Sequence, residues 1–197
     1  MKTLNQFIKE SLLDDEDELT AKLPTEIIKS FIDDNYNVTG KLDIKESNNI
    51  YVVNCNGDVR IKNNKITQLT NGFFEWGVVK GNFNCSNCTS LKDLTGAPKE
   101  IDGDFNCYRC ESLKDLTGAP EKVGRDFECF GCESLTSLEG APEKVGGRFY
   151  CIKCTSLTSL QGAPKKVGGD FGCNDCKIKF TEDDVKKVSK VKGKIIV

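Results

Sequence analysis

The sequence of 197 residues contains no histidine. Histidine is the usual base beside a serine or cysteine nucleophile, a frequent zinc ligand and the side chain that transfers protons near neutral pH. Its absence excludes Ser/His and Cys/His catalytic pairs, histidine-ligated zinc and imidazole proton shuttles. The chain also shows no other nucleophile and base pair and no glycine-rich phosphate loop. We therefore expect a protein that is not an enzyme and uses no cofactor.

An excess of positive charge is missing too, because 28 Lys and Arg stand against 30 Asp and Glu, for a formal net charge of −2. A protein whose main partner is nucleic acid needs clustered cations to neutralise phosphates, so this balance argues against such a partner. No apolar run approaches the roughly eighteen residues of a membrane span, and the first residues lack the features of an export signal. We expect a cytoplasmic protein without membrane association.

What the sequence does contain is an internal repeat of 22 residues, which reads FxCxxCxSLxxLxGAPxxVxGx. Such a fixed period is typical of repeat architectures, in which each unit packs on the next. The repeated positions include Phe83, Phe105, Phe127, Phe149 and Phe171; Cys85, Cys107, Cys129, Cys151 and Cys173; Cys88, Cys110, Cys132, Cys154 and Cys176; and the Gly-Ala-Pro triplets at 96–98, 118–120, 140–142 and 162–164.

Within each unit the segment VxGxFxC alternates apolar and polar residues, which predicts a short strand with one buried face. The Ser-Leu run then turns the chain, and Gly-Ala-Pro breaks regular structure and sends the chain back. Each unit is thus one coil of a solenoid, with parallel strands about 4.8 Å apart and with phenylalanines and cysteines stacked inside. Weaker copies begin at Val38, Gly57 and Val191. The pattern predicts a mainly β fold of about eight short parallel strands.

The repeat divides the chain into three predicted parts. Residues 1–36 form a helical leader and cap, residues 37–180 the repeat solenoid, and residues 181–197 a cap helix and a final strand. The cap helix follows from Thr181, which precedes an acidic first turn. In the leader, Pro24 starts a second helix after five acids at 14–18. The apolar faces of the two leader helices carry Leu4, Phe7, Ile8 and Leu12, and then Ile27, Ile28 and Phe31.

Over about residues 79–180 the repeat resembles the leucine-rich-repeat pattern LxLxxCxxL, and residues 154–160 are similar to bacterial and bacteriophage variants with coils of 22 or 23 residues. The resemblance implies a leucine-rich-repeat-like right-handed solenoid. Where the family has its first leucine, this chain has Asp102, Gly124, Gly146 and Gly168. A flatter right-handed β-solenoid is therefore the alternative to a horseshoe with a helical convex side.

The opening residues 1–19 resemble the leaders of proteins from crAss-like tailed phages that infect Bacteroides. That resemblance implies a phage-encoded protein located in the host cytoplasm or in the virion.

The cysteines allow more than one interpretation. Cys85-x-x-Cys88 and Cys107-x-x-Cys110 satisfy the spacing of a zinc ribbon. The 22-residue coil already explains this spacing, however, since phenylalanine and leucine keep it as well. We interpret the cysteines as small buried core residues, with zinc or iron–sulfur ligation and redox thiols as the alternatives. No metal ligand is therefore predicted.

If Phe127 points inward, the alternation of the strand points its neighbours Asp126 and Glu128 outward, together with Phe130. Aromatic anchors with a charged rim have the composition of a protein-binding hot spot, whereas the alternative is a ladder that only stabilises the sheet. The predicted partner-binding residues are Tyr108, Phe130, Tyr150, Ile152, Asp126, Glu128 and Arg148.

The sequence thus favours a non-enzymatic protein-binding module that uses the exposed sheet face of a repeat solenoid. The first alternative is a phage virion or assembly component docked through its N-terminal helix, and the second is a zinc-binding repeat protein. The expected partner is a protein, with self-association or virion association as the further alternatives.

Overall fold

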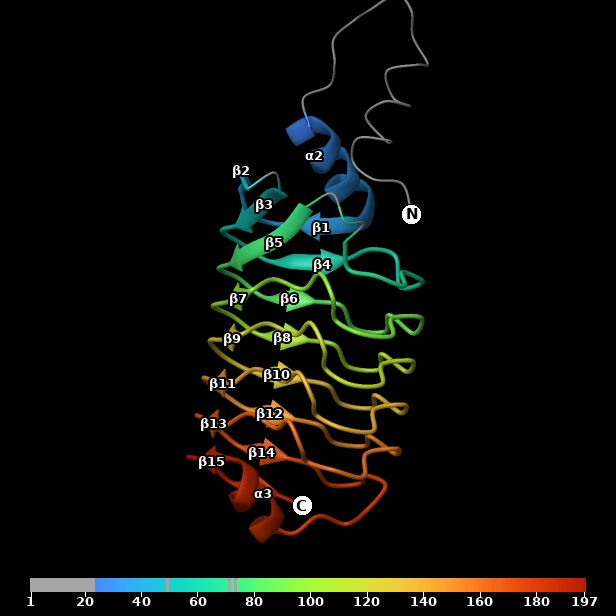
Figure 1. The fold of residues 1–197 in the computed structure, drawn as a ribbon, viewed down its shortest axis with the longest axis vertical. Helices are drawn as coiled ribbons and strands as arrows, with labels where there is room; N and C mark the ends of the chain where they lie inside the picture. Colours follow the sequence, from blue (N-terminus) through green and yellow to red (C-terminus); the bar gives the residue numbers. More distant parts are fainter. Residues whose placement is uncertain (1–23, 49, 71, 73) are drawn as a thin grey trace, which may run out of the picture.

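The computed structural model describes residues 24–48, 50–70, 72 and 74–197, and the predicted first leader helix and acidic run lie outside these residues. Strands stack along the long axis, with α2 at one end and α3 at the other (Figure 1). In chain order the elements are α2 (Pro24–Asn35), β1 (Tyr36–Val38), β2 (Leu42–Ser47), β3 (Ile50–Cys55), β4 (Val59–Ile61), β5 (Phe74–Val79), β6 (Phe83–Asn84), β7 (Glu100–Ile101), β8 (Phe105–Asn106), β9 (Lys122–Val123), β10 (Phe127–Glu128), β11 (Lys144–Val145), β12 (Phe149–Tyr150), β13 (Lys166–Val167), β14 (Phe171–Gly172), α3 (Glu182–Val188), β15 (Lys190–Val191) and β16 (Ile195–Ile196).

Each regular coil contributes one short strand to each of two sheets. Sheet A has the order β1-β4-β6-β8-β10-β12-β14-β16, and sheet B has the order β15-β13-β11-β9-β7-β5-β3-β2. Equivalent residues of successive coils pair in parallel, as Phe127 does with Phe149 and Val123 with Val145. The predicted copy at Val191 is confirmed, because Val191 pairs with Val167 and Ile195 with Phe171. The fold is a parallel β-solenoid of about seven turns with 22-residue coils.

The prediction of one strand per coil was wrong, because the segment VxGxFxC folds as two strands with a corner between them. In the coil of Phe127, Val123 lies in β9 and Phe127 in β10, and residues 124–126 turn the corner. The corner is tight: a Cβ on Gly146 would lie 2.0 Å from the carbonyl oxygen of Gly124 in the preceding coil. The glycines of this segment therefore let the backbones of successive coils stack at a bend.

The weak copy at residues 38–44 is not a parallel coil either. β2 pairs antiparallel with β3, from Leu42 opposite Cys55 to Ser47 opposite Ile50, and β1 pairs antiparallel with β4. Only two residues separate β2 from β3, whereas a parallel connection needs a crossover of a dozen or more. The short connection therefore enforces a hairpin, and the parallel stack begins at β3 in sheet B and at β4 in sheet A.

A third side of each coil has no strands but still bonds from coil to coil. It carries the two buried leucines of the repeat, such as Leu135 and Leu138. The Leu116 N–H donates to the Glu139 carbonyl at 2.8 Å, and the Leu138 N–H to the Gln161 carbonyl at 3.1 Å. The Gly-Ala-Pro triplet then returns the chain to sheet B through a turn with positive φ, 85° at Gly140.

The interior is a set of stacked ladders, as predicted. The five phenylalanines of the repeat are buried in register, with ring centroids 5.9 Å apart for Phe83 and Phe105 and 5.0 to 5.4 Å apart for the pairs that follow. Nine of the ten repeat cysteines are buried and Cys176 is partly exposed. The cysteine and phenylalanine positions therefore form the core of the solenoid.

The two described helices lie at opposite ends of the stack (Figure 1). In α2, Ile28 and Ile32 are fully buried in the same core as Val53. In α3, Thr181 accepts a hydrogen bond from the Asp184 N–H, which caps the first turn, and Val185 is buried. Neither helix is long and apolar enough to span a bilayer.

Candidate functional site

The predicted binding residues lie on three successive coils, within or next to the sheet A strands β8, β10 and β12. Glu128 in β10 pairs with Tyr150 in β12. Tyr108, Phe130 and Ile152 occupy the turn that follows each sheet A strand. Hydrogen bonds hold these turns in register: the Arg109 N–H donates to the Phe130 carbonyl at 2.8 Å, and the Gly131 N–H to the Ile152 carbonyl at 2.9 Å. We call Tyr108, Phe130, Tyr150 and Ile152 the aromatic patch.

The side chains of the aromatic patch are half-buried and not fully exposed as the alternation predicted. One cause is Gly172, where a Cβ would lie 2.9 Å from the Cδ1 atoms of both Tyr150 and Ile152. Because the next coil carries no side chain at this position, the two side chains lean over its backbone. This contact covers part of Tyr150 and Ile152 and leaves the rest of each side chain exposed.

Cationic side chains lie over the rings of the patch. The Lys153 ammonium is 5.5 Å from the centre of the Phe130 ring, and the Arg148 guanidinium is 5.3 Å from that of Tyr150. Arg109 stands 6.0 Å from the ring of Tyr108. Each contact of this kind is worth about 0.5–1 kcal/mol at an exposed site. The patch thus has an apolar floor and a rim of positive charge.

Two of these cations sit on a backbone that L-residues avoid. Arg109 has a φ of 53° and Lys153 one of 56°, whereas the equivalent residue between them is Gly131 with a φ of 67°. The left-handed conformation costs an L-residue about 1–2 kcal/mol, and glycine escapes that cost. The backbone at the rim of the patch is therefore strained at two of its three turns.

Asp126 and Arg148 form the strongest ion pair beside the patch. The Arg148 Nη2 and Nε atoms lie 2.6 and 2.9 Å from Oδ2 of Asp126. Burial alone would raise the pKa of Asp126, but the hydrogen bonds and the charge of Arg148 hold this pKa below its usual value. The structure thus brings together these two predicted site residues.

The same aspartate belongs to a ladder of side chains along the corner between the sheets. Asp126 Oδ1 accepts the Arg148 N–H at 2.7 Å, and Asp104 Oδ1 accepts the Asp126 N–H at 3.0 Å. Asp58, Asn82 and Asp170 make the equivalent bond to the next coil. Arg148 is the exception, because a guanidinium has no acceptor to offer. The corner ladder is interrupted at that coil.

Glu128 behaves differently from Asp126. Its partial burial raises the pKa of its carboxyl above the usual value, and the negative charges of Asp126 and Asp104 act in the same direction, against the opposing charge of Arg148. Oε2 accepts one hydrogen bond from Asn106 Nδ2 at 3.0 Å. Ionised Glu128 is therefore less favourable in the fold than in water.

The cysteines bond to the backbone of neighbouring coils. Cys132 Sγ donates to the Cys107 carbonyl at 3.2 Å, and Cys154 Sγ to the Cys129 carbonyl at 3.2 Å. Burial raises the pKa of Cys107 well above the usual thiol value. Among the residues that the structure describes, no three Cys, Asp or Glu side chains converge on a point where they could hold a metal ion. The cysteine spacing that matches a zinc ribbon thus corresponds in this structure to a stack of thiols.

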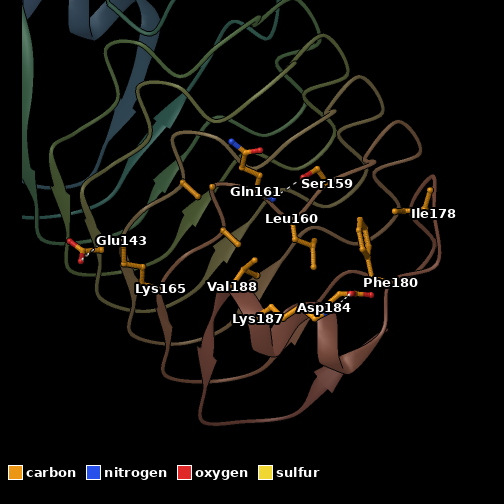
Figure 2. A pocket seen from close by; sticks show the side chains of 13 residues that line it. Glu143, Ser159, Leu160, Gln161, Lys165, Ile178, Phe180, Asp184, Lys187 and Val188 are labelled. Carbon is orange, nitrogen blue, oxygen red and sulfur yellow. Dashed lines mark hydrogen bonds and ion pairs between the residues drawn. The ribbon is translucent and has the colours of Figure 1, made fainter.

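A groove that the sequence analysis missed lies between α3 and the third side of the preceding coils (Figure 2). Its volume is about 890 Å³, and its apolar lining comes from Leu160, Ala163, Ile178, Phe180 and Val188. The repeat itself carried a signal. The 22-residue step from Leu157 and Leu160 leads to Lys179 and Glu182, so the third side loses its two leucines in the last coil. We call this feature the α3 groove.

Comparison with protein-family models, with curated proteins and with solved structures finds no significant match to this chain.

Proposed function

We propose that this protein is a non-enzymatic binding module that holds a protein partner on the aromatic patch. The observation that carries the proposal is the placement of Tyr108, Phe130 and Ile152 at equivalent turns of three successive coils, on a backbone fixed by hydrogen bonds. A preorganised apolar surface loses little conformational freedom on binding, and aromatic side chains dominate the energetics of protein interfaces.

The charges around the patch indicate what the partner surface carries. Arg109 and Lys153 flank the rings, and no ion pair joins either of them to another described residue. Arg148 is already neutralised by Asp126. A complementary partner therefore offers apolar side chains to the rings and carboxylates to Arg109 and Lys153.

The repeat supports the finer parts of the proposal. We also propose a leucine-rich-repeat-like coil of the bacterial and bacteriophage type, because the residues that match that pattern, Phe127, Cys129, Cys132 and Leu135, are all buried. We include in the proposal that α2 and α3 cap the solenoid, since each buries apolar residues at one end of the stack. A phage-encoded protein in the host cytoplasm or in the virion remains the expected source and location.

The test is affinity capture from the natural host with wild-type protein and the Phe130→Asp variant. Phe130 is half-buried on a turn, so the substitution is expected to leave the far-UV circular dichroism spectrum unchanged and to abolish capture of the partner. Tyr51→Asp is the matched control, because Tyr51 is a half-buried aromatic residue on sheet B. Capture that survives in Phe130→Asp, or that is lost equally in Tyr51→Asp, would overturn the proposal.

A structural component held by its N-terminal residues would respond differently when those residues are deleted. Deletion of residues 1–22 should leave capture intact for a binding module. For a structural component, the deletion should remove the chain from the assembled particle even though the aromatic patch is intact.

A further inference from the structure

The α3 groove is an apolar surface at the end of the solenoid opposite to α2 (Figures 1 and 2). Ile178 is 44% exposed, and only two other large apolar residues among those described, Ile50 and Val197, are exposed to a comparable extent. Ile178, Phe180 and Val188 line the groove beside Leu160. A partner that covered these side chains would remove apolar surface from water, which favours binding.

The rim of the groove is basic. Lys177 and Lys179 flank Ile178 in the sequence and are exposed, and Lys165 and Lys187 line the groove itself. Lys165 pairs with Glu143 at 3.5 Å and Lys187 with Asp184 at 3.2 Å, but all four side chains are largely exposed. Such surface pairs contribute little and exchange readily for another anion. Residues 177–197 carry seven lysines against three acids.

One segment of this chain has the complementary composition. Leu4, Phe7, Ile8 and Leu12 have the spacing of one helix face, and five acidic residues follow at 14–18. These residues lie outside the part of the chain that the structure describes. An apolar face matches the lining of the groove, and the adjacent acidic run matches its lysine rim. We propose that the α3 groove binds residues 4–18 of a second copy of this chain.

The geometry favours a second copy over the same chain. The eight strands of sheet A make seven steps of about 4.8 Å, so the ends of the stack are about 34 Å apart. If residues 4–18 occupy the groove, residues 19–23 connect them to α2, and these five residues span at most about 18 Å when fully extended, at about 3.6 Å per residue. This is about half the distance, so a chain cannot place the whole segment in its own groove.

Docking in trans is heterologous, because each copy supplies one segment and one groove. One such contact leaves one segment and one groove free, so two copies can exchange segments and close a dimer, or further copies can add to form a ring or an open chain. The inference does not depend on the aromatic patch, which lies on sheet A.

Sedimentation velocity of the full chain over a range of concentrations tests the proposal. We expect concentration-dependent association that weakens as salt screens the lysines and the acidic run. Phe7→Asp in the segment and Ile178→Asp in the groove should each weaken association by at least about tenfold, a loss of about 1.4 kcal/mol. Ile50→Asp is the matched control, because Ile50 is 43% exposed in β3 at the other end, and it should associate as the wild type does.

Mixing the two variants makes the test decisive. Ile178→Asp keeps an intact segment and Phe7→Asp keeps an intact groove, so an equimolar mixture should form a one-to-one complex and nothing larger. A wild type that stays monomeric, association that survives either substitution, or a mixture that stays monomeric would each overturn the proposal. If Ile178→Asp does not fold by circular dichroism, Lys179→Glu replaces it with the same expected outcomes.

Discussion

Replacing Phe127 by leucine removes a ring that lies between two other rings and keeps most of the apolar volume. The ring centroids of Phe105 and Phe149 lie 5.0 and 5.4 Å from that of Phe127. Each aromatic pair contributes about 0.5–1.5 kcal/mol beyond the area that it buries. Phe127→Leu should therefore lower the free energy of unfolding by about 1–3 kcal/mol, before any cost of repacking.

Phe171→Leu provides the comparison that cancels most other effects. Phe171 is equally buried but has one ring neighbour in the ladder, Phe149 at 5.2 Å, because Ile195 occupies the next coil. The expected loss is about 0.5–1.5 kcal/mol, half that of Phe127→Leu. The difference between the variants isolates one ring pair.

Guanidinium unfolding is the assay, followed by circular dichroism and by the fluorescence of Trp76, the single tryptophan, which is buried at the α2 end of the core. Coincident transitions are required, since a repeat array can unfold in parts. An equal loss in both variants, or a larger loss in Phe171→Leu, would refute the idea that the stacked rings stabilise the fold as pairs.

Gly146→Ala should destabilise the protein by about 1–3 kcal/mol in the same assay, because its Cβ meets a backbone carbonyl that has no room to move. Gly131→Ala meets no close atom and should cost only the left-handed strain of about 1–2 kcal/mol; a larger loss than for Gly146→Ala would contradict the corner geometry. Asp126→Asn should destabilise the fold at neutral pH, and its deficit against the wild type should close as the pH falls below about 4 and through the lowered pKa of Asp126. Glu128→Gln should show the opposite sign, a gain in unfolding free energy at neutral pH that disappears as the pH falls towards about 4; a loss at neutral pH would contradict the raised pKa of Glu128. The buried repeat thiols should resist alkylation at about pH 8 until denaturant unfolds the chain, as followed by mass spectrometry, and rapid labelling of the folded protein would contradict their burial.

The repeat period predicted the core but not the number of sheets. Phe127, Cys129 and Leu135 recur every 22 residues and are buried, because each of these side chains packs on its equivalent in the next coil. The corner at residues 124–126 escaped prediction since a glycine fits both the outward face of a strand and a bend. The distance from the glycine to the backbone carbonyl of the neighbouring coil decides between a strand and a bend. The alternation of apolar and polar residues along the chain gives no information on that distance.

The sequence predicted which residues of the aromatic patch lie near one another, but it predicted their exposure less well. Phe130 and Ile152 lie on neighbouring turns as expected, because strands in register place equivalent residues side by side. Their partial burial depends on Gly172 and Lys153, which come from other coils or from the turn. The α3 groove was missed because the sequence analysis followed the residues that repeat and not Lys179 and Glu182, where the repeat fails.

The ladder of Asp and Asn side chains along the corner has a consequence for the length of the molecule. Each of these side chains accepts the N–H of the equivalent residue one coil later. Coils that carry Asp or Asn at this corner position can therefore follow one another in any order. Duplicating residues 102–123 would therefore extend the stack by one strand spacing, about 4.8 Å, without creating a new type of junction. The coil of Arg148 is not interchangeable in this way, because the guanidinium offers no acceptor to the next coil. Gain or loss of whole units in the gene would thus change the distance between the two ends of the protein in steps of one strand spacing.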